Sequence, residues 1–303
     1  MTATASSSAK LRVDTRGTNE LPPHLDENLL TPRFYVTEFK KAAKTELTDA
    51  REEFEAMLSE MKADYNCTHF DRKASLDRLQ ELPQKAKETY ESYLVRSVIS
   101  EFSGFLLFKE ISNRLKKEGN RDLGKLFQFL ARDEARHAGF LSRALVAEGI
   151  EVDLPHLGGK RAATWFPISW VIYSVYLSEK IGYWRYILMD RHLKANPDQA
   201  FAPLFDFFEP WCQDENRHGD CFTVMMRCWP GITKGFRGKL LSRFFLWSVF
   251  LTHTLTVCER GEFYELLGID PKEFDEEVIK RTNHTSKNAF PWVFNLDDNK
   301  IGI

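Results

Sequence analysis

The sequence predicts an all-α protein, built as a helical bundle with extra N- and C-terminal helices. Apolar residues recur every three or four positions through several long segments, which is the spacing of one face of an α-helix. No segment shows sustained alternation of apolar and polar residues between turn signals, so we expect almost no sheet. With 303 residues, 43% of them hydrophobic, the chain has ample material for a large core.

The N-terminal part is predicted to divide into an arm and a helical extension. Residues 1–40 should form a flexible arm, because a start rich in Ala, Ser and Thr is followed by a glycine and several prolines. Residues 41–84 should form the extension, with a highly charged helix over residues 39–65 and a second helix that starts near Ser75. Pro83 marks a kink or a restart of that second helix.

Residues 85–268 are predicted to form the bundle itself, a four-helix arrangement that includes a fifth long helix. Glycine and proline residues separate its segments, as expected at helix ends. The helices are expected at residues 85–118, 122–148, 168–194, 198–228 and 239–267. Residues 269–303 are predicted to form one more short helix and a tail.

The composition excludes some partners and leaves one open. A formal net charge of -2 provides no basic excess to neutralise phosphates, so nucleic acid is not expected as a partner. The five cysteines form no C-x-x-C pair and indicate reduced thiols in an intracellular compartment. Two uncharged stretches, residues 162–178 and 244–258, are explained most simply as buried bundle helices, with contact at a membrane surface as the alternative.

Four glutamates lie on helix faces that are otherwise apolar: Glu101, Glu134, Glu179 and Glu215. A buried carboxylate without a partner is costly or becomes protonated, so each of these requires a compensating group. One such glutamate is usually explained by a salt bridge or by a misjudged helix face. Four of them together indicate a shared site.

Two of these glutamates belong to matching D-E-x-R-H pentads, at residues 133–137 and 214–218. Each pentad places a histidine, His137 or His218, three residues after its glutamate, so both side chains leave one face of a helix a turn apart. The pentad glutamates also follow the other two glutamates by similar intervals of 33 and 36 residues. The repeat matters because a single Glu-x-x-His match is close to what chance provides.

Two helices that each give a glutamate, with two that each give Glu-x-x-His, form the di-iron site of ferritin-like bundles. Carboxylates with one imidazole per metal favour iron or manganese over zinc. We therefore predict a catalytic centre of two iron ions, with Glu101 and Glu179 as terminal ligands and Glu134 and Glu215 as bridging ligands. The imidazoles of His137 and His218 complete the ligand set.

Three further residues are candidates for supporting these ligands from outside. Asp133 and Asp214 could each accept a hydrogen bond from the second ring nitrogen of a ligand histidine. Pairing of the two aspartates with Arg136, Arg217 or an opposite helix is an equally good interpretation. His253 lies inside an apolar helix and is explained more simply as a hydrogen-bonded core histidine.

Longer runs around the predicted ligands are much more specific than Glu-x-x-His alone. They read EFSGFLLFKE at residues 101–110, FLARDEARHAGFL at 129–141, YLSEKIGYWRY at 176–186 and FEPWCQDENRHGD at 208–220. These runs resemble the aerobic magnesium-protoporphyrin IX monomethyl ester oxidative cyclases, and the similarity covers the chain from about Thr31 to its C-terminus. Members of that family usually continue for some tens of residues beyond the position of Ile303, so a truncated tail is expected.

The resemblance implies a membrane-associated di-iron monooxygenase of chlorophyll and bacteriochlorophyll synthesis. Such an enzyme would convert Mg-protoporphyrin IX 13-monomethyl ester to divinyl protochlorophyllide, closing the isocyclic fifth ring with O₂ as co-substrate. Its electrons would come from NADPH through a ferredoxin-like donor, and an accessory cyclase subunit would be a further partner. It would lie in the bacterial cytoplasm, peripheral on the photosynthetic membrane, with a plastid membrane as the less favoured location.

Two other interpretations stay open from the sequence. The same scaffold serves other ferritin-like di-iron oxidases, including desaturase-like enzymes, and it also serves non-catalytic iron-binding bundles. The sequence has no Rossmann glycine fingerprint to hold a nicotinamide or flavin, so an oxidase of this kind needs electrons from outside. The metal site is inferred from the residues themselves, whereas the porphyrin substrate rests on the resemblance.

Overall fold

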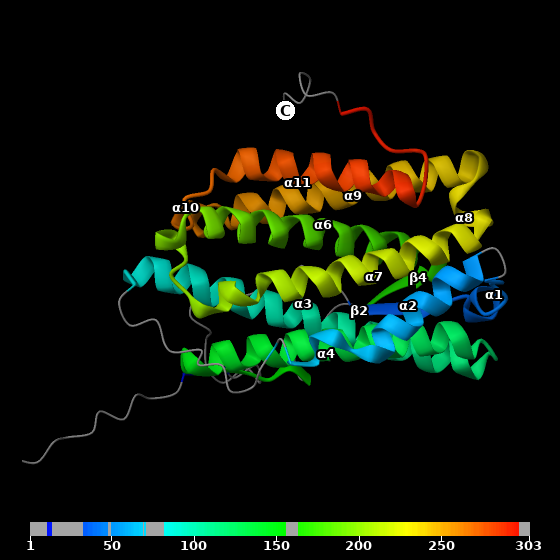
Figure 1. Cartoon of the computed structure of the whole chain (residues 1–303), viewed down its shortest axis with the longest axis horizontal. Helices are drawn as coiled ribbons and strands as arrows, with labels where there is room; N and C mark the ends of the chain where they lie inside the picture. Colours follow the sequence, from blue (N-terminus) through cyan, green and yellow to red (C-terminus); the bar gives the residue numbers. More distant parts are fainter. Residues whose placement is uncertain are drawn as a thin grey trace, which may run out of the picture.

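The computed structural model describes residues 11–13, 33–47, 50–68, 70, 82–155 and 163–296. Within these ranges the chain is almost entirely helical, which confirms the predicted all-α class. The long helices run nearly parallel to the long axis of the molecule (Figure 1).

Four long helices form the bundle: α3 Gln84–Lys117, α4 Arg121–Ala147, α6 Ile168–Ala195 and α7 Phe208–Cys228. Helix α3 packs against α4 and α6 packs against α7, while α7 also contacts α4. The turn between α3 and α4 explains why these helices end where predicted. Gly119 adopts a positive φ of 96°, and the side chain of Asn120 then caps α4 by accepting from the backbone N–H of Leu123 at 3.0 Å.

Helix α7 begins later than predicted. Residues 198–207, assigned to the same helix from the sequence, instead form parts of two short 3₁₀ segments, η4 Pro197–Gln199 and η5 Pro203–Phe207. Pro203 opens the second segment, and a proline inside a continuous α-helix would remove a backbone hydrogen bond. Pro210 lies in the first turn of α7, where a proline is tolerated.

The predicted fifth long helix is interrupted. A short helix α8, Pro230–Thr233, leads into α9 Gly235–Glu259, and α10 Gly261–Leu266 follows after the non-helical residue Arg260. The C-terminal helix α11 covers Pro271–Thr285 and is followed by the 3₁₀ segment η6 Ser286–Asn288. Helices α9 and α11 both pack against α6, so they form one side of the molecule and α4 lies on the opposite side (Figure 1).

The N-terminal extension is more broken than predicted. The helix expected over residues 39–65 is divided into α1 Phe39–Ala42 and α2 Arg51–Ala63, and the 3₁₀ segment η3 Tyr65–Thr68 follows them. Asp64 separates the last two in a left-handed conformation with φ 54°. Helix α2 packs its buried face against α4 and α7. The predicted helix start at Ser75 lies outside the described residues, and Pro83 directly precedes α3.

Two short parallel strand pairs tie the N-terminal region to later segments. Strand β1 Leu11–Val13 pairs with β3 Ile150–Val152, and β2 Arg33–Thr37 pairs with β4 Ala163–Pro167. The prediction that residues 1–40 lack regular structure was therefore wrong for these two strands. Strands this short give no periodic signal, and their partners lie far away in the sequence. Residues 1–10 and 14–32 of the predicted arm lie outside the described residues.

The core is aromatic where α3, α4 and α7 meet, and this packing can be tested. Phe127 on α4 is fully buried, and its ring centroid lies 5.9 Å from those of Phe108 on α3 and Phe222 on α7. Phe127→Ala would leave a cavity between three helices, so the free energy of unfolding should fall by about 3–5 kcal/mol in urea titrations followed by circular dichroism. As a control, Leu106→Ala at a 41% exposed side chain should change it by less than about 1 kcal/mol. Similar losses in the two variants would contradict the packing.

Candidate metal centre

The six residues predicted as metal ligands come together inside the bundle. All six are buried, with exposed fractions between 0% and 8%. Helix α3 provides Glu101, α4 provides Glu134 and His137, α6 provides Glu179, and α7 provides Glu215 and His218. They form two adjacent groups, each built around one histidine.

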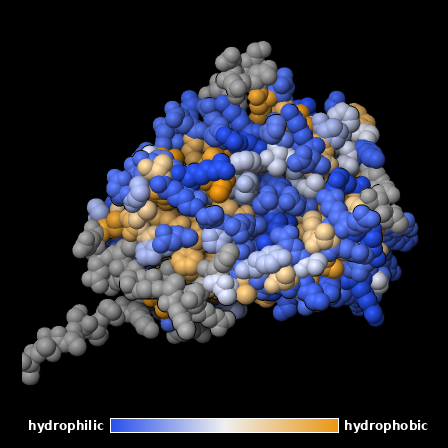
Figure 2. Space-filling model, viewed as in Figure 1, coloured by the Kyte–Doolittle hydropathy of each residue, from blue (hydrophilic) through white to orange (hydrophobic). Residues whose placement is uncertain are grey.

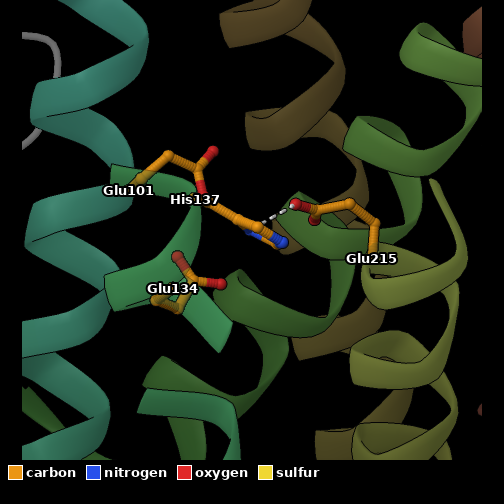
Figure 3. Close-up of side chains that lie close together, drawn as sticks. All are labelled: Glu101, Glu134, His137 and Glu215. Atoms are coloured by element: carbon orange, nitrogen blue, oxygen red, sulfur yellow. Dashed lines mark hydrogen bonds and ion pairs between the residues drawn. The ribbon is translucent and has the colours of Figure 1, made fainter. Parts of the chain in front are cut away.

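The first group surrounds His137. Its Nδ1 lies 3.2 Å from Glu101 Oε2 and 3.8 Å from Glu215 Oε1. Glu134 joins this group, and one oxygen or nitrogen from each of the four residues lies within 4.8 Å of the others. Figure 3 shows these side chains approaching one another from three helices, with the contact between His137 and Glu215 drawn as a dashed line.

The second group surrounds His218. Its Nδ1 lies 3.2 Å from Glu179 Oε2 and 3.3 Å from Glu134 Oε1. Glu134 therefore belongs to both groups and lies between them. The two histidine rings are 6.2 Å apart between centroids. The internal repeat of the sequence thus becomes a pair of neighbouring ligand groups in the structure.

Burial and the mutual repulsion of the carboxylates both oppose ionisation of the ligand glutamates. Burial raises the pKa of Glu134 to about 8, and the neighbouring charge of Glu101 contributes to the shift. Burial, followed by the charges of Glu179 and Glu101, raises the pKa of Glu215 well above its ordinary value. Two divalent cations would balance four carboxylates. Oxygen donors with one imidazole in each group fit iron or manganese better than zinc.

The outer nitrogen of each histidine faces the aspartate of the other pentad. His137 Nε2 lies 3.1 Å from Asp214 Oδ2, and His218 Nε2 lies 3.6 Å from Asp133 Oδ2. Burial alone would lower the pKa of His137, but its contacts with Asp214 and Glu101 hold that pKa well above its ordinary value. The sequence predicts one aspartate beside each ligand histidine. It does not show that each histidine contacts the aspartate of the other pentad.

Asp133 and Asp214 are also paired with arginines. Both contacts that the sequence suggested for these aspartates, with a ligand histidine and with an arginine, are therefore present. Arg132 Nε donates to Asp133 Oδ1 at 2.9 Å, and Arg217 Nη1 donates to Asp214 Oδ1 at 3.0 Å. Arg136 Nη1 lies 3.7 Å from Asp133 Oδ1. Each aspartate therefore connects a histidine of the site to an arginine further out.

Helix α2 and the residues that follow it close the outer side of this network. Asp64 accepts a hydrogen bond from Arg136 at 2.8 Å, and Glu60 accepts one from Arg217 at 2.9 Å. The buried Asn66 donates from Nδ2 to Asp214. The sequence gives no signal for these three residues, because α2 reads as a charged helix whose partners cannot be told from its own pattern.

His253, the third supporting candidate, lies apart from the ligand groups. It is 4% exposed, and its Nδ1 is 2.6 Å from Asp275 Oδ1 on α11. Its Nε2 has no hydrogen-bond partner among the described residues. The ring lines a cavity of about 420 Å³ between α3, α6 and α9, and the four ligand glutamates line the same cavity.

Two glycines face glutamates that come from neighbouring helices, and Gly104 leaves room that a side chain would fill. A Cβ atom at Gly104 would lie 2.4 Å from Glu134 Oε2, and one at Gly182 would lie 3.5 Å from Glu215 Oε2. Each glycine follows a ligand glutamate of its own helix by three residues. This repeated Glu-x-x-Gly spacing is the sequence signal that identifies them.

Trp211 orients one of the ligand carboxylates. Its Nε1 donates to Glu215 Oε1 at 2.8 Å. Its ring centroid lies 5.1 Å from that of His137 and 4.9 Å from that of Tyr186. From the sequence, Trp211 is one more apolar residue on the core face of α7, because nothing in the pattern shows where its N–H points.

A bundle with two such carboxylate–histidine groups defines a ferritin-like protein of the di-iron carboxylate type. In agreement with this, the family model described as rubrerythrin matches residues 92–226, a range that begins in α3 and ends in α7. No solved structure matches the chain.

Relatives match nearly the whole chain. A magnesium-protoporphyrin IX monomethyl ester [oxidative] cyclase from Prochlorococcus marinus is 78% identical over 94% of this chain and 82% of its own length. Another, from Thermosynechococcus vestitus, is 53% identical over 89% of this chain and 77% of its own length. A third, from Nostoc sp., is 51% identical over 91% and 78%. The chain therefore belongs to the magnesium-protoporphyrin IX monomethyl ester oxidative cyclase family, which confirms the resemblance of its motifs.

The close approach of Gly104 to Glu134 predicts a selective loss of metal binding in Gly104→Ala. The added methyl group would occupy the position of the Glu134 carboxylate. This side chain can swing aside, so the fold should persist while the carboxylate leaves the place between the two groups. We expect the affinity for ferrous iron, measured by anaerobic titration, to fall about 10- to 100-fold.

Gly139→Ala is the matched control, because a Cβ atom at this exposed position of α4 would meet nothing within 4 Å. It should bind iron as the wild type does. It should also stabilise the helix by about 0.5–1 kcal/mol, since alanine restricts the unfolded chain more than glycine. Equal iron affinities in the two variants would contradict the placement of Glu134.

Proposed function

We propose that this chain is the di-iron subunit of the cyclase that forms the isocyclic fifth ring of chlorophyll precursors. It would convert Mg-protoporphyrin IX 13-monomethyl ester to divinyl protochlorophyllide with O₂ and external electrons. The proposal is carried by two adjacent buried carboxylate–histidine groups in a chain whose near full-length relatives are named as this cyclase. Those relatives favour this reaction over a desaturase-like oxidase or a non-catalytic iron-binding bundle.

The six buried residues would hold two irons. Glu134 belongs to both groups and would contribute to holding both ions, whereas Glu215, the other predicted bridging ligand, belongs to the first group only. Glu101 with His137, and Glu179 with His218, would be the outer ligands of the two ions. When bound, the iron pair supplies the redox chemistry that activates O₂ toward an unreactive C–H bond.

The surrounding residues keep these ligands in place. The aspartate contacts fix the ring orientation of both histidines, so that Nδ1 of each faces the glutamates. Trp211 holds the Glu215 carboxylate by its Nε1–H. The adjoining cavity borders the four ligand glutamates, so it would give a substrate side chain access to them.

Electrons are proposed to come from NADPH through a ferredoxin-type donor, with an accessory cyclase subunit as a further partner. The sequence supports an outside source, since it contains no glycine fingerprint for a nicotinamide or flavin. The donor must reach a centre whose ligands are no more than 8% exposed.

Turnover and metal content test the proposed reaction. The full chain should bind about two irons. With the monomethyl ester, O₂ and reduced ferredoxin, it should form the cyclised product.

His218→Ala should abolish turnover while the helical content measured by circular dichroism persists, because it removes the only imidazole of the second group. Glu262→Ala, at an exposed glutamate paired with Lys85, should leave turnover unchanged. Iron oxidation without any cyclised product, or a content near one iron, would refute the proposal.

The outer face of α9 supports a peripheral membrane location. Its large apolar side chains are between 43% and 82% exposed and follow one another at intervals of three or four residues. This α9 stripe consists of Phe236, Leu240, Phe244, Trp247, Leu251 and Leu255. The sequence interpretation of residues 244–258 as a buried helix is thus wrong for this face. The face of the molecule drawn in Figure 2 is, by contrast, mostly hydrophilic.

Charge at the start of α9 indicates the kind of surface that would cover the stripe. Lys234, Arg237 and Lys239 are exposed there, and the first acidic residue of the helix is Glu259. By length and composition α9 could cross a membrane, yet 33% of its apolar segment is buried against the protein. An apolar stripe with basic residues at one end fits the surface of a bilayer with anionic lipids. We therefore propose that the chain lies peripherally on the cytoplasmic face of the bacterial photosynthetic membrane.

Vesicle flotation tests the membrane proposal. The wild-type chain should float with vesicles that contain phosphatidylglycerol, and less so in high salt. Trp247→Glu combined with Leu251→Glu should abolish flotation, because two charges would have to enter the bilayer interface. The control Val146→Glu changes a 48% exposed apolar residue of α4 and should have no effect. Failure of the wild type to float, or equal flotation of both variants, would contradict the role of the stripe.

A further inference from the structure

The cavity beside the metal centre has an acidic wall and a basic end. The ligand glutamates lie in its wall, while Arg96 on α3, Arg185 on α6 and Arg260, which directly follows α9, line the other end. Along α6, Arg185 follows Glu179 by six residues, which corresponds to about 9 Å at 1.5 Å per residue. Arg96 is already paired with Glu259, at 2.7 Å between Nη1 and Oε2.

The other two arginines have no acidic partner. No carboxylate of the described residues lies within 4.0 Å of Arg185 or Arg260. The Nε atom of each is buried and has no hydrogen-bond partner in the described part of the chain. Their guanidinium groups lie over tyrosine rings instead, with Cζ 4.9 Å from the centroid of Tyr186 and 5.7 Å from that of Tyr93.

The neighbours of these arginines provide no charge that pairs with them directly. Burial raises the pKa of Tyr93 to about 12, so its phenol is neutral at physiological pH. Burial also lowers the pKa of His253, and the charges of Arg185 and Arg260 oppose the effect of Asp275, so this imidazole is neutral as well. Asp275 itself is engaged by His253. Neither of the two positive charges at this end of the cavity therefore has an ion-pair partner, and such charges favour binding of an anion.

The proposed substrate contains an anion of the right kind, so this inference rests on the proposed function. Protoporphyrin IX has two propionate side chains, and its monomethyl ester keeps one of them as a free carboxylate. The planar fork of arginine matches a carboxylate through two parallel hydrogen bonds. We propose that Arg185 and Arg260 bind this free carboxylate and thereby direct the methyl-esterified propionate toward the ligand glutamates.

This anchor makes the cavity selective for one ester state of the porphyrin. In the dimethyl ester both propionates are neutral, so the arginines would gain no ionic partner. The macrocycle contributes the same apolar contacts in both esters. The difference in binding between the two esters therefore isolates the contribution of the arginines.

Binding of these two magnesium porphyrins to the full chain tests the anchor. Quenching of tryptophan fluorescence, measured without reductant, reports binding independently of turnover. The wild type should bind the monomethyl ester about 10- to 100-fold more tightly than the dimethyl ester. Arg185→Ala and Arg260→Ala should each reduce this preference, and the double variant should abolish it, by weakening only the monomethyl ester. Lysine at either position should retain part of the preference, since it keeps the charge but not the fork.

Arg281→Ala is the matched control, because it removes a guanidinium that is paired with Glu277 and does not line the cavity. It should keep the full preference, and circular dichroism should show that all variants are folded. Equal binding of both esters by the wild type, or equal weakening of both in the arginine variants, would overturn the anchor and leave the proposed function standing. Failure of the iron-loaded chain to bind either ester would overturn both.

Discussion

Repulsion among four buried carboxylates is the constraint on which the rest of the structure depends. Side chains whose charges alternate in sign from the centre of the bundle to its surface offset this repulsion. One such series runs Glu101, His137, Asp214, Arg217 and Glu60, with every contact between 2.9 and 3.2 Å. A second runs Glu179, His218, Asp133, Arg132 and Asp64, with contacts of 2.9 to 3.6 Å. Because both series end on α2 or the residue after it, the N-terminal extension is part of the electrostatics of the centre.

The sequence predicts the features that repeat and misses those that depend on a distant partner. Three bundle helices appear within a few residues of their predicted bounds, since their apolar faces extend over many turns. The six ligands stand out because the pentad and its preceding glutamate occur twice. In contrast, β2 and Asn66 are defined only by contacts with segments more than a hundred residues away, and no local pattern reports such contacts. Residues 198–207 read as helical because helical propensity is local, whereas Pro203 interrupts a continuous helix there.

Helix α9 shows a different limit of sequence reasoning. It is apolar nearly all round, and such a helix is expected to be buried. The structure buries only one of its faces, which carries His253 and borders the cavity, and leaves the α9 stripe uncovered. Composition alone does not distinguish the buried face of this helix from the exposed one. The two proposed contacts, with a porphyrin on one face and a bilayer on the other, therefore follow from burial and not from hydropathy.

The internal repeat leaves the two ligand groups unequal. The His137 ring lies 5.2 Å from Phe70 and 5.1 Å from Trp211, between centroids, and its Nε2 is within hydrogen-bonding distance of an aspartate. The His218 ring has no aromatic neighbour other than His137 among the described residues, and its aspartate is 3.6 Å away. A more basic imidazole donates more electron density to the ion it binds. The two halves would therefore present imidazoles of unequal basicity to the ions that they hold.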